Sequence, residues 1–245
     1  MKSEYLLFNI IVISGPLLFG SMRSFYFLDR VKFTILPILI PAILFLIWDS
    51  TVTFSHWHFN EKYVLGITIF NLPIEEILFF ITVPFACLFT WEMIIRRTNE
   101  KELVWINKIR PYLYFIIPMG IWFFISGRHY TGLAVSFLGL AILLDQVLNT
   151  NLLLKRRFYL YLLFILFFTL IFNGYLTWRP VVTYGVDYQL DFRIITIPIE
   201  DFVYGTALIF MNTSIYQKII SRKVLTENIQ TKENISKKKL FHYSK

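Results

Sequence analysis

Two short acidic motifs contain the residues of this chain that are best suited to proton transfer. In the first, Glu75 and Glu76 follow a Pro-Ile dipeptide, and in the second, Glu200 and Asp201 follow the same dipeptide 125 residues later. A carboxyl group acts as a general acid when it is protonated and as a general base when it is ionised. The two motifs are therefore candidate catalytic sites.

Both motifs lie in stretches that are apolar enough to be inside a membrane. The acids of the first motif are the only charged residues between residues 64 and 91, and those of the second are the only ones between residues 194 and 217. A carboxylate at membrane depth costs about 2.5–3.5 kcal/mol on insertion scales, so even one such residue indicates a function. The repetition of this costly arrangement strengthens the interpretation.

Helix geometry limits how these acids can meet. Adjacent residues point about 100° apart around a helix, so Glu75 and Glu76 cannot both face one point. One acid from each motif can instead face its counterpart across the interface between two helices. In apolar surroundings, repulsion and low dielectric disfavour two neighbouring charges, so one carboxyl keeps its proton while another stays ionised. We expect such an acid and base pair here.

Helix capping is the alternative interpretation of the acidic motifs. Proline is favoured at the first position of a helix, and acids are favoured in the first turn, near the free backbone N–H groups. In that case, helices begin at Pro73 and Pro198 at the membrane surface, and the acids are hydrated. The charge-free residues 64–72 count against this reading, because they would have to lie on the bilayer or re-enter it.

The composition is typical of a membrane protein. Hydrophobic residues make up 56% of the 245 residues and charged residues only 16%. The excess of 24 Lys and Arg over 16 Asp and Glu could indicate a nucleic-acid-binding protein, but no soluble scaffold is evident that would carry a basic face. Membrane orientation explains the basic residues better, and we expect no nucleic-acid partner.

Seven apolar runs are long enough to cross a bilayer as helices. They cover approximately residues 5–20, 31–48, 66–94, 111–126, 130–148, 158–176 and 194–216. The expected fold is therefore an all-α polytopic membrane protein. Of the Lys and Arg residues, 19 lie in the loops of one side or in the tail, and five lie on the other side. This asymmetry predicts a multi-pass protein of the cell (inner) membrane, with the N-terminus outside and the C-terminus in the cytoplasm.

The spacing of polar residues indicates an internal repeat. Asp49 and Asn173 precede the two acidic motifs by similar distances, where they either cap their helices or hydrogen-bond the carboxylates. We expect two parallel three-helix repeats joined by a linking helix, with one site at their interface. The predicted divisions are a first repeat at 1–95, a linking helix region at 96–129, a second repeat at 130–216 and a basic, largely disordered cytoplasmic tail at 217–245.

Other polar motifs are weaker candidates. His56 and His58 flank Trp57 in a predicted outside loop, but two histidines without a third ligand are more often surface residues than metal ligands. No glycine-rich nucleotide fingerprint, His-Glu-x-x-His or Cys-x-x-Cys motif is present. We therefore expect neither a cofactor nor a metal. Aromatic residues after the acids, namely Phe79, Phe80, Phe202 and Tyr204, could line a cavity and stabilise a cation.

The repeated Pro73-Ile74-Glu75-Glu76 and Pro198-Ile199-Glu200-Asp201, with Trp48-Asp49 and Asn173 before them, resemble the lycopene cyclase domain of the heterodimeric and fused type. Over about residues 1–216, the chain is similar to the tandem fusion of two small membrane subunits. The resemblance implies closure of the linear ends of lycopene into β-rings, an intramolecular lyase or isomerase reaction of carotenoid biosynthesis without redox change or flavin. The implied partners are lycopene or another linear carotenoid, the lipid bilayer and other carotenoid-pathway enzymes.

The implied chemistry needs one acid and one base. An acid protonates a terminal double bond, the neighbouring double bond attacks the cation, and a base removes a proton from the ring. Glu75 and Glu200 are the first choices for these roles, with Glu76 and Asp201 as their partners. A carotenoid hydratase of related type begins with the same protonation, and a proton-coupled membrane transporter would also place carboxylates at a repeat interface. A non-catalytic membrane scaffold would tolerate glutamine at all four positions.

Overall fold

Helices form most of the protein. A computed structural model describes residues 2–22 and 25–243, with side chains up to Thr226. Within these residues there are eight α-helices: α1 Glu4–Gly20, α2 Ile35–Val52, α3 Ile74–Arg97, α4 Ile106–Leu113, α5 Ile116–Ile125, α6 His129–Val147, α7 Arg156–Trp178 and α8 Ile199–Tyr243. Helices α2, α3, α6 and α7 are long and apolar enough to cross a membrane, and α1 is a shorter apolar helix. The fold is that of a multi-pass helical membrane protein.

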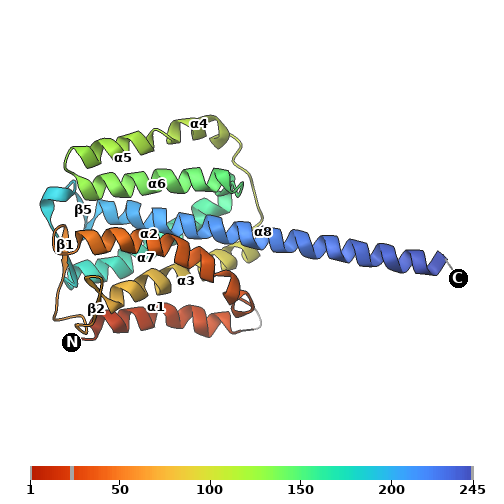
Figure 1. The fold of residues 1–245 in the computed structure, drawn as a ribbon, viewed down its shortest axis with the longest axis horizontal. Helices are drawn as coiled ribbons and strands as arrows, with labels where there is room; N and C mark the ends of the chain where they lie inside the picture. The colour runs from red at the N-terminus through yellow and green to blue at the C-terminus, as the bar shows by residue number, and fades with distance from the viewer. Residues whose placement is uncertain (1, 23–24, 244–245) are drawn as a thin grey trace.

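The helices run side by side between two ends of the bundle (Figure 1). We call these the strand end, where the short β-strands lie, and the tail end, where α8 leaves the bundle. Helix α1 packs on α3, and α6 packs on α8 in the same way. Helix α2 packs on α8, whereas α7 packs on α3. Each of these packing pairs thus has its counterpart in the other repeat, and α4 with α5 provides the connection.

Two short hairpins come directly before the acidic helices. Strand β2 (Thr68–Ile69) pairs with β3 (Leu72–Pro73), and β5 (Arg193–Ile194) pairs with β6 (Ile197–Pro198). A left-handed backbone at the turns, with φ of 49° at Phe70 and 61° at Ile195, suits such tight hairpins. These strands correct the all-α prediction, and they replace the first part of the helix predicted at 66–94. A short apolar run does not by itself distinguish a strand from a helix.

A third strand pair links the two repeats at the strand end. Strand β1 (Trp57–Phe59) pairs antiparallel with β4 (Val182–Tyr184). In this register, His58 lies opposite Thr183, the residue 125 positions after it. Each strand is therefore paired with its own repeat counterpart, which requires an approximate two-fold axis between the strands. The same axis relates the packing pairs of the helices.

The linking segment, α4 with α5, folds back on α6 of the second repeat, so that α5 and α6 form a tight helical hairpin. The helix predicted at 111–126 is divided into α4 and α5, because Pro118 has no N–H to continue the ladder to Tyr114. Helices α5 and α6 then approach closely. A Cβ atom at Gly120 or Gly132 would lie 2.4 Å from an atom of the neighbouring helix. Glycine is required at these positions by the close contact of the two helices.

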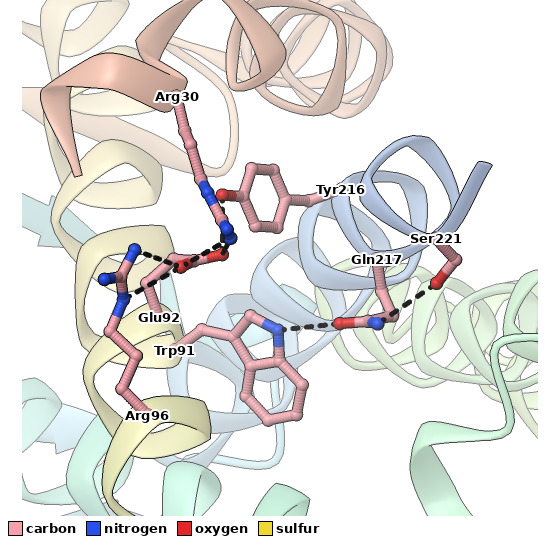
Figure 2. A network of polar contacts seen from close by, with 7 residues as sticks. All are labelled: Arg30, Trp91, Glu92, Arg96, Tyr216, Gln217 and Ser221. Atoms are coloured by element: carbon pink, nitrogen blue, oxygen red, sulfur yellow. Dashed lines mark hydrogen bonds and ion pairs between the residues drawn. The ribbon is translucent and has the colours of Figure 1, made fainter. Parts of the chain in front are cut away.

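The two-fold relation extends to the tail end of the bundle, as Figure 2 shows. The indole Nε1 of Trp91 donates to the Gln217 side chain at 3.3 Å, and the Tyr216 hydroxyl donates to Glu92 at 2.8 Å. Tyr216 and Gln217 occupy the positions 125 residues after Trp91 and Glu92. Each central helix, α3 and α8, therefore contributes one donor and one acceptor to the other. These reciprocal contacts hold the two helices together at the tail end.

Glu92 in this network is buried among cations, whereas its counterpart is an amide. Arg30 and Arg96 both form ion pairs with the buried Glu92, at 3.0 and 3.3 Å (Figure 2). The counterparts of Glu92 and Arg96 in the second repeat are Gln217 and Ser221, which are uncharged and hydrogen-bond each other at 3.2 Å. Beyond them, α8 continues as a helix to Tyr243, where the composition of 217–245 led us to expect a disordered tail. The Lys, Glu and Gln residues of this segment are good helix formers.

Candidate active site

An apolar cavity begins at the strand end of the bundle and extends toward the tail end as far as Phe19 of α1 and Thr90 of α3. Its volume is about 360 Å³, and it is lined mainly by α1, α3, α7 and α8. Among its lining residues are three acids and one amide: Asp49, Glu76, Asp201 and Asn173. The rest of the wall is largely aliphatic and aromatic, including Phe79, Phe80 and Tyr204 as predicted. Phe202, predicted to belong to the same wall, is buried but does not line the cavity.

The two acids of each motif have different surroundings because they begin a helix. Glu76 and Asp201 line the cavity, and they come from the first turns of α3 and α8. Glu75 and Glu200 point away from the cavity, toward the segments that precede the hairpins. They accept hydrogen bonds from the backbone N–H groups of Leu65 and Leu190, respectively, each at 2.7 Å. One acid from each motif thus faces a common space, as helix geometry predicted. They are not the two acids that were our first choices.

Glu75 and Glu200 anchor the segments that close the strand end. Glu200 also accepts the Thr131 hydroxyl at 2.6 Å. In each of the two side chains, the other carboxyl oxygen is buried and has no hydrogen-bond partner among the described residues. The helix-capping interpretation therefore describes the position of these acids correctly, because they lie in the first turn. It does not describe their environment, because both side chains are buried rather than hydrated.

Asp201 is surrounded by hydrogen-bond donors. The hydroxyl of Tyr130 donates to it at 2.5 Å, the amide of Asn173 at 2.7 Å and the hydroxyl of Tyr184 at 2.9 Å. Tyr184 lies on β4, where burial and the nearby Asp201 hold its pKa well above the usual range. Its hydroxyl therefore stays protonated and remains a donor. Three converging donors suit an ionised carboxylate.

Glu76 occupies the corresponding position in the first repeat but has fewer donors. Tyr5, the counterpart of Tyr130, donates to it at 2.5 Å. The counterpart of Tyr184 is Phe59, which has no hydroxyl. Asn173 of α7 corresponds to Asp49 of α2 at an offset of 124 residues, one fewer than elsewhere in the repeat. Asp49 is itself an acid and accepts a hydrogen bond from the Tyr204 hydroxyl at 2.7 Å. Glu76 therefore shares the cavity with a second carboxyl where Asp201 has an amide.

Of the four tyrosines at the site, Tyr5, Tyr130 and Tyr184 were absent from the candidates drawn from the sequence, and Tyr204 was expected only as an aromatic lining residue. Tyr5 and Tyr130 are 125 residues apart, the same spacing as the acidic motifs, and each contacts the cavity-facing acid of its own repeat. That shared spacing was a usable signal. Tyr184 and Tyr204 gave no such signal, because their counterparts are Phe59 and Phe79. Only the tertiary structure brings their hydroxyls to Asp201 and Asp49.

The histidines at the strand end do not form a metal site with each other. His58 lies at the centre of the β1–β4 pair, whereas His56 contacts His129, with Nε2 and Nδ1 3.2 Å apart. The His56 ring also stacks on Tyr188. Burial and the neighbouring His129 lower the pKa of His56 to about 4, so its ring is neutral at pH 7. No group of three metal-ligating side chains occurs among the described residues.

Comparison with known proteins agrees with the internal repeat. The family model of lycopene cyclases matches two segments of the chain, residues 2–94 and 127–219. The two segments begin 125 residues apart, which is the offset that relates the acidic motifs and the strands. No curated protein sequence and no solved structure matches the chain significantly. With both repeats matched over more than half of its length, the chain belongs to the lycopene cyclase family.

Proposed function

We propose that this chain is a membrane-embedded lycopene β-cyclase, which closes the linear ends of lycopene into β-rings by proton transfer alone. The observation that carries the proposal is that Glu76 and Asp201, one from each repeat, face the same apolar cavity. An isomerisation through a carbocation needs an acid, a base and a dry space between them. Family membership supplies the class of substrate, a linear carotenoid.

The hydrogen bonds distinguish the roles of the two acids. Asp201 accepts three hydrogen bonds and is therefore suited to be the ionised base. Glu76 accepts one hydrogen bond from Tyr5 and has Asp49 in the same cavity, so this carboxyl pair is suited to hold a proton. In the proposed reaction, Glu76 with Asp49 gives a proton to the terminal double bond. Asp201 then removes a proton from the ring.

The wall of the cavity supports a cation between these two steps. After protonation, the positive charge lies on the tertiary carbon of the terminal double bond. The neighbouring double bond attacks this carbon, closes the ring and leaves the charge on a ring carbon until the proton is lost. The faces of Phe79, Phe80 and Tyr204 can stabilise this charge. The apolar lining also keeps water from capturing the cation.

The basic residues support an orientation for the site. By the positive-inside rule, the tail end lies in the cytoplasm and the strand end faces outward. Glu76 and Asp201 then lie toward the outer side of the cell membrane, beneath the β1–β4 pair. Lycopene dissolves in lipid rather than in water, so it reaches the cavity from within the bilayer, between helices.

Expression of the chain in a lycopene-accumulating bacterium tests the proposed function. The expected product has the same mass as lycopene and a blue-shifted, less structured absorption spectrum, because ring closure twists the terminal double bonds out of conjugation. A product heavier by one water for each reacted end, with an almost unchanged chromophore, would show a hydratase instead. If lycopene stayed unchanged at normal protein levels, neither enzyme activity would be present, and the chain would be a transporter or a non-catalytic scaffold instead.

A further inference from the structure

We propose that the cavity is a channel for one arm of a linear carotenoid, which lies between α1 and α7, so that each binding event forms one ring. This inference rests on the proposed function, because it deepens the description of the same site. It goes further by assigning the path of the polyene, the residues that keep this path open and the number of ends that are held at one time.

The shape of the cavity fits an extended apolar chain. It reaches from the cluster of Asp49, Glu76 and Asp201 to Phe19 on α1 and Thr90 on α3. Glu76 and Thr90 are 14 residues apart on one helix, which corresponds to about 21 Å along the helix axis. Away from the acids, the wall is formed by residues such as Val12 and Phe168. The acids thus lie at one end of a long apolar space, where the end of a polyene would be placed.

The corresponding space in the other half of the molecule is filled. Phe45 of α2 packs against Phe137 of α6, Tyr204 of α8 and Phe80 of α3, with ring centroids 4.5, 4.6 and 6.2 Å apart. Between α2 and α7 the repeat offset is 124 residues, one fewer than elsewhere, since the buried Pro41 and Val52 of α2 then align with the buried Ile165 and Leu176 of α7. At this offset the counterpart of Phe45 is Thr169, four residues before Asn173. Thr169 is too small to make the same contacts, and it lines the cavity.

The partners of Phe45 are also replaced by smaller residues on the open side. The counterpart of Phe137 is Val12, and the counterpart of Phe80 is Gly205; both line the cavity with Thr169. Three phenylalanines of one half thus become valine, threonine and glycine in the other. In the described part of the two-fold scaffold, one channel is open, and the position symmetric to it is filled by aromatic side chains.

Two glycines on the open side leave space rather than allow close packing. A Cβ atom built on Gly15 or Gly205 would meet no atom within 4 Å, although both residues line the cavity. At Gly120 of the α5–α6 contact, the same atom would lie 2.4 Å from Ser136. A glycine in the middle of a helix destabilises it by roughly 0.5–1 kcal/mol relative to alanine. At Gly15 and Gly205, we infer that this cost is compensated by room for the substrate.

A single open channel has a consequence for the order of the reaction. One arm of the polyene occupies the channel, with its end at the acids, while the other arm extends into lipid. The second end can react only after the molecule leaves and binds again in the opposite direction. A monocyclic carotene is therefore a released intermediate of any bicyclic product, or the final product.

Blocking variants test the path of the polyene. Gly205→Phe restores the residue of the filled half, and it should weaken lycopene binding at least about tenfold, the scale of a small misfit in an apolar pocket. Gly205→Ala should weaken it less. Binding is measured as quenching of tryptophan fluorescence by lycopene in lipid nanodiscs, in a Glu76→Gln background that prevents turnover. The matched controls are Ile10→Phe on α1 and Leu163→Phe on α7, the two helices that flank the proposed channel; these residues are 53% and 64% exposed and do not line the cavity.

The outcomes separate this inference from the proposed function. Unchanged binding in Gly205→Phe, with normal folding by circular dichroism, would overturn the channel whatever the product is. Loss of binding in both control variants would overturn it too, because the effect would not be specific to the channel. Normal binding through the channel together with a hydrated or unchanged product would overturn only the cyclase proposal.

A chase experiment tests the release of the intermediate. Wild-type protein is given isotopically labelled lycopene and then an excess of unlabelled lycopene. If one arm is held at a time, labelled monocyclic carotene accumulates, and its conversion to the bicyclic carotene slows in the presence of the chase. Labelled bicyclic product that forms at an undiminished rate, without free monocyclic carotene, would overturn the one-arm inference.

Discussion

The two repeats share a backbone plan but differ in the side chains at their interface. Each places one acid of its motif on the cavity and uses the other to hold the chain before its hairpin. Among the described residues, Asp201 has three donors, whereas Glu76 has one donor and shares the cavity with Asp49. One half is open beside the acids and the other is filled. The common scaffold therefore sets the positions of the acids, and the local differences set what each can do.

The largest difference in cyclisation rate is expected between variants of the cavity-facing acids, Glu76 and Asp201, and variants of the outer acids, Glu75 and Glu200. Glu76→Gln and Asp201→Asn keep the shape of the side chain but remove the transferable proton or the basic oxygen. Each should lower the rate of cyclisation by about 10²–10⁴-fold, the usual contribution of a general acid or base. Glu75→Gln and Glu200→Gln should lower the rate much less, because the amide oxygens can still accept hydrogen bonds from the backbone N–H groups of Leu65 and Leu190. Rates are measured at matched protein levels in isolated membranes.

Folding must be followed in the same experiment, because the outer acids hold the chain before the hairpins. Glu75→Gln and Glu200→Gln are expected to reduce the amount of inserted protein more than the turnover of the protein that remains. If these two variants lost turnover completely while Glu76→Gln and Asp201→Asn retained it, the assignment of roles from the cavity would be wrong. The first choice made from the sequence would then be correct.

A smaller effect is expected from the donors that distinguish the two acids. A hydrogen bond to a charged group contributes about 1.5–3 kcal/mol, or roughly 10–100-fold in an equilibrium or rate. Tyr184→Phe should therefore slow the step that uses Asp201 by no more than this range, since two other donors remain. The change makes β4 resemble β1, which has Phe59 at the same position.

The converse change provides the matched control. Phe59→Tyr would add to β1 the hydroxyl that Tyr184 has on β4, and it should slow protonation by stabilising the ionised form of Glu76 or Asp49. The pH dependence of the rate separates the two variants, because they act on a base and on an acid respectively. Equal pH profiles for the two variants would contradict the different roles assigned to the repeats.

The helices, the repeat and the acids could be predicted from the sequence because each leaves a local pattern. Apolar runs of bilayer length and the offset of 125 residues are visible without coordinates. The hairpins were missed because residues 66–73 are as apolar as the helix after them. Which of Glu75 and Glu76 faces the cavity could not be predicted, because it depends on the residue at which α3 begins. A shift of one residue would turn both side chains by about 100° and place Glu75 in the direction of Glu76.

The asymmetry of the site was also beyond the sequence. Val12, Thr169 and Gly205 are far apart in the chain and have no feature that marks them as one wall. Their significance comes from comparison with Phe137, Phe45 and Phe80, which requires both the two-fold relation and the contacts. The hydroxyls of Tyr184 and Tyr204 reach their acids from distant elements for the same reason. Long-range contacts of this kind leave no periodicity.

The central claim is that one carboxyl gives a proton to the carotenoid while a different carboxyl removes another. The most direct test is conversion of lycopene by membranes in deuterium oxide, followed by mass spectrometry of the product. Because the acid exchanges with solvent between turnovers, each ring should contain one deuterium, and no deuterium should enter the unreacted end. A cyclic product without deuterium would mean that a proton moves within the substrate, and it would contradict the acid and base roles of Glu76 and Asp201.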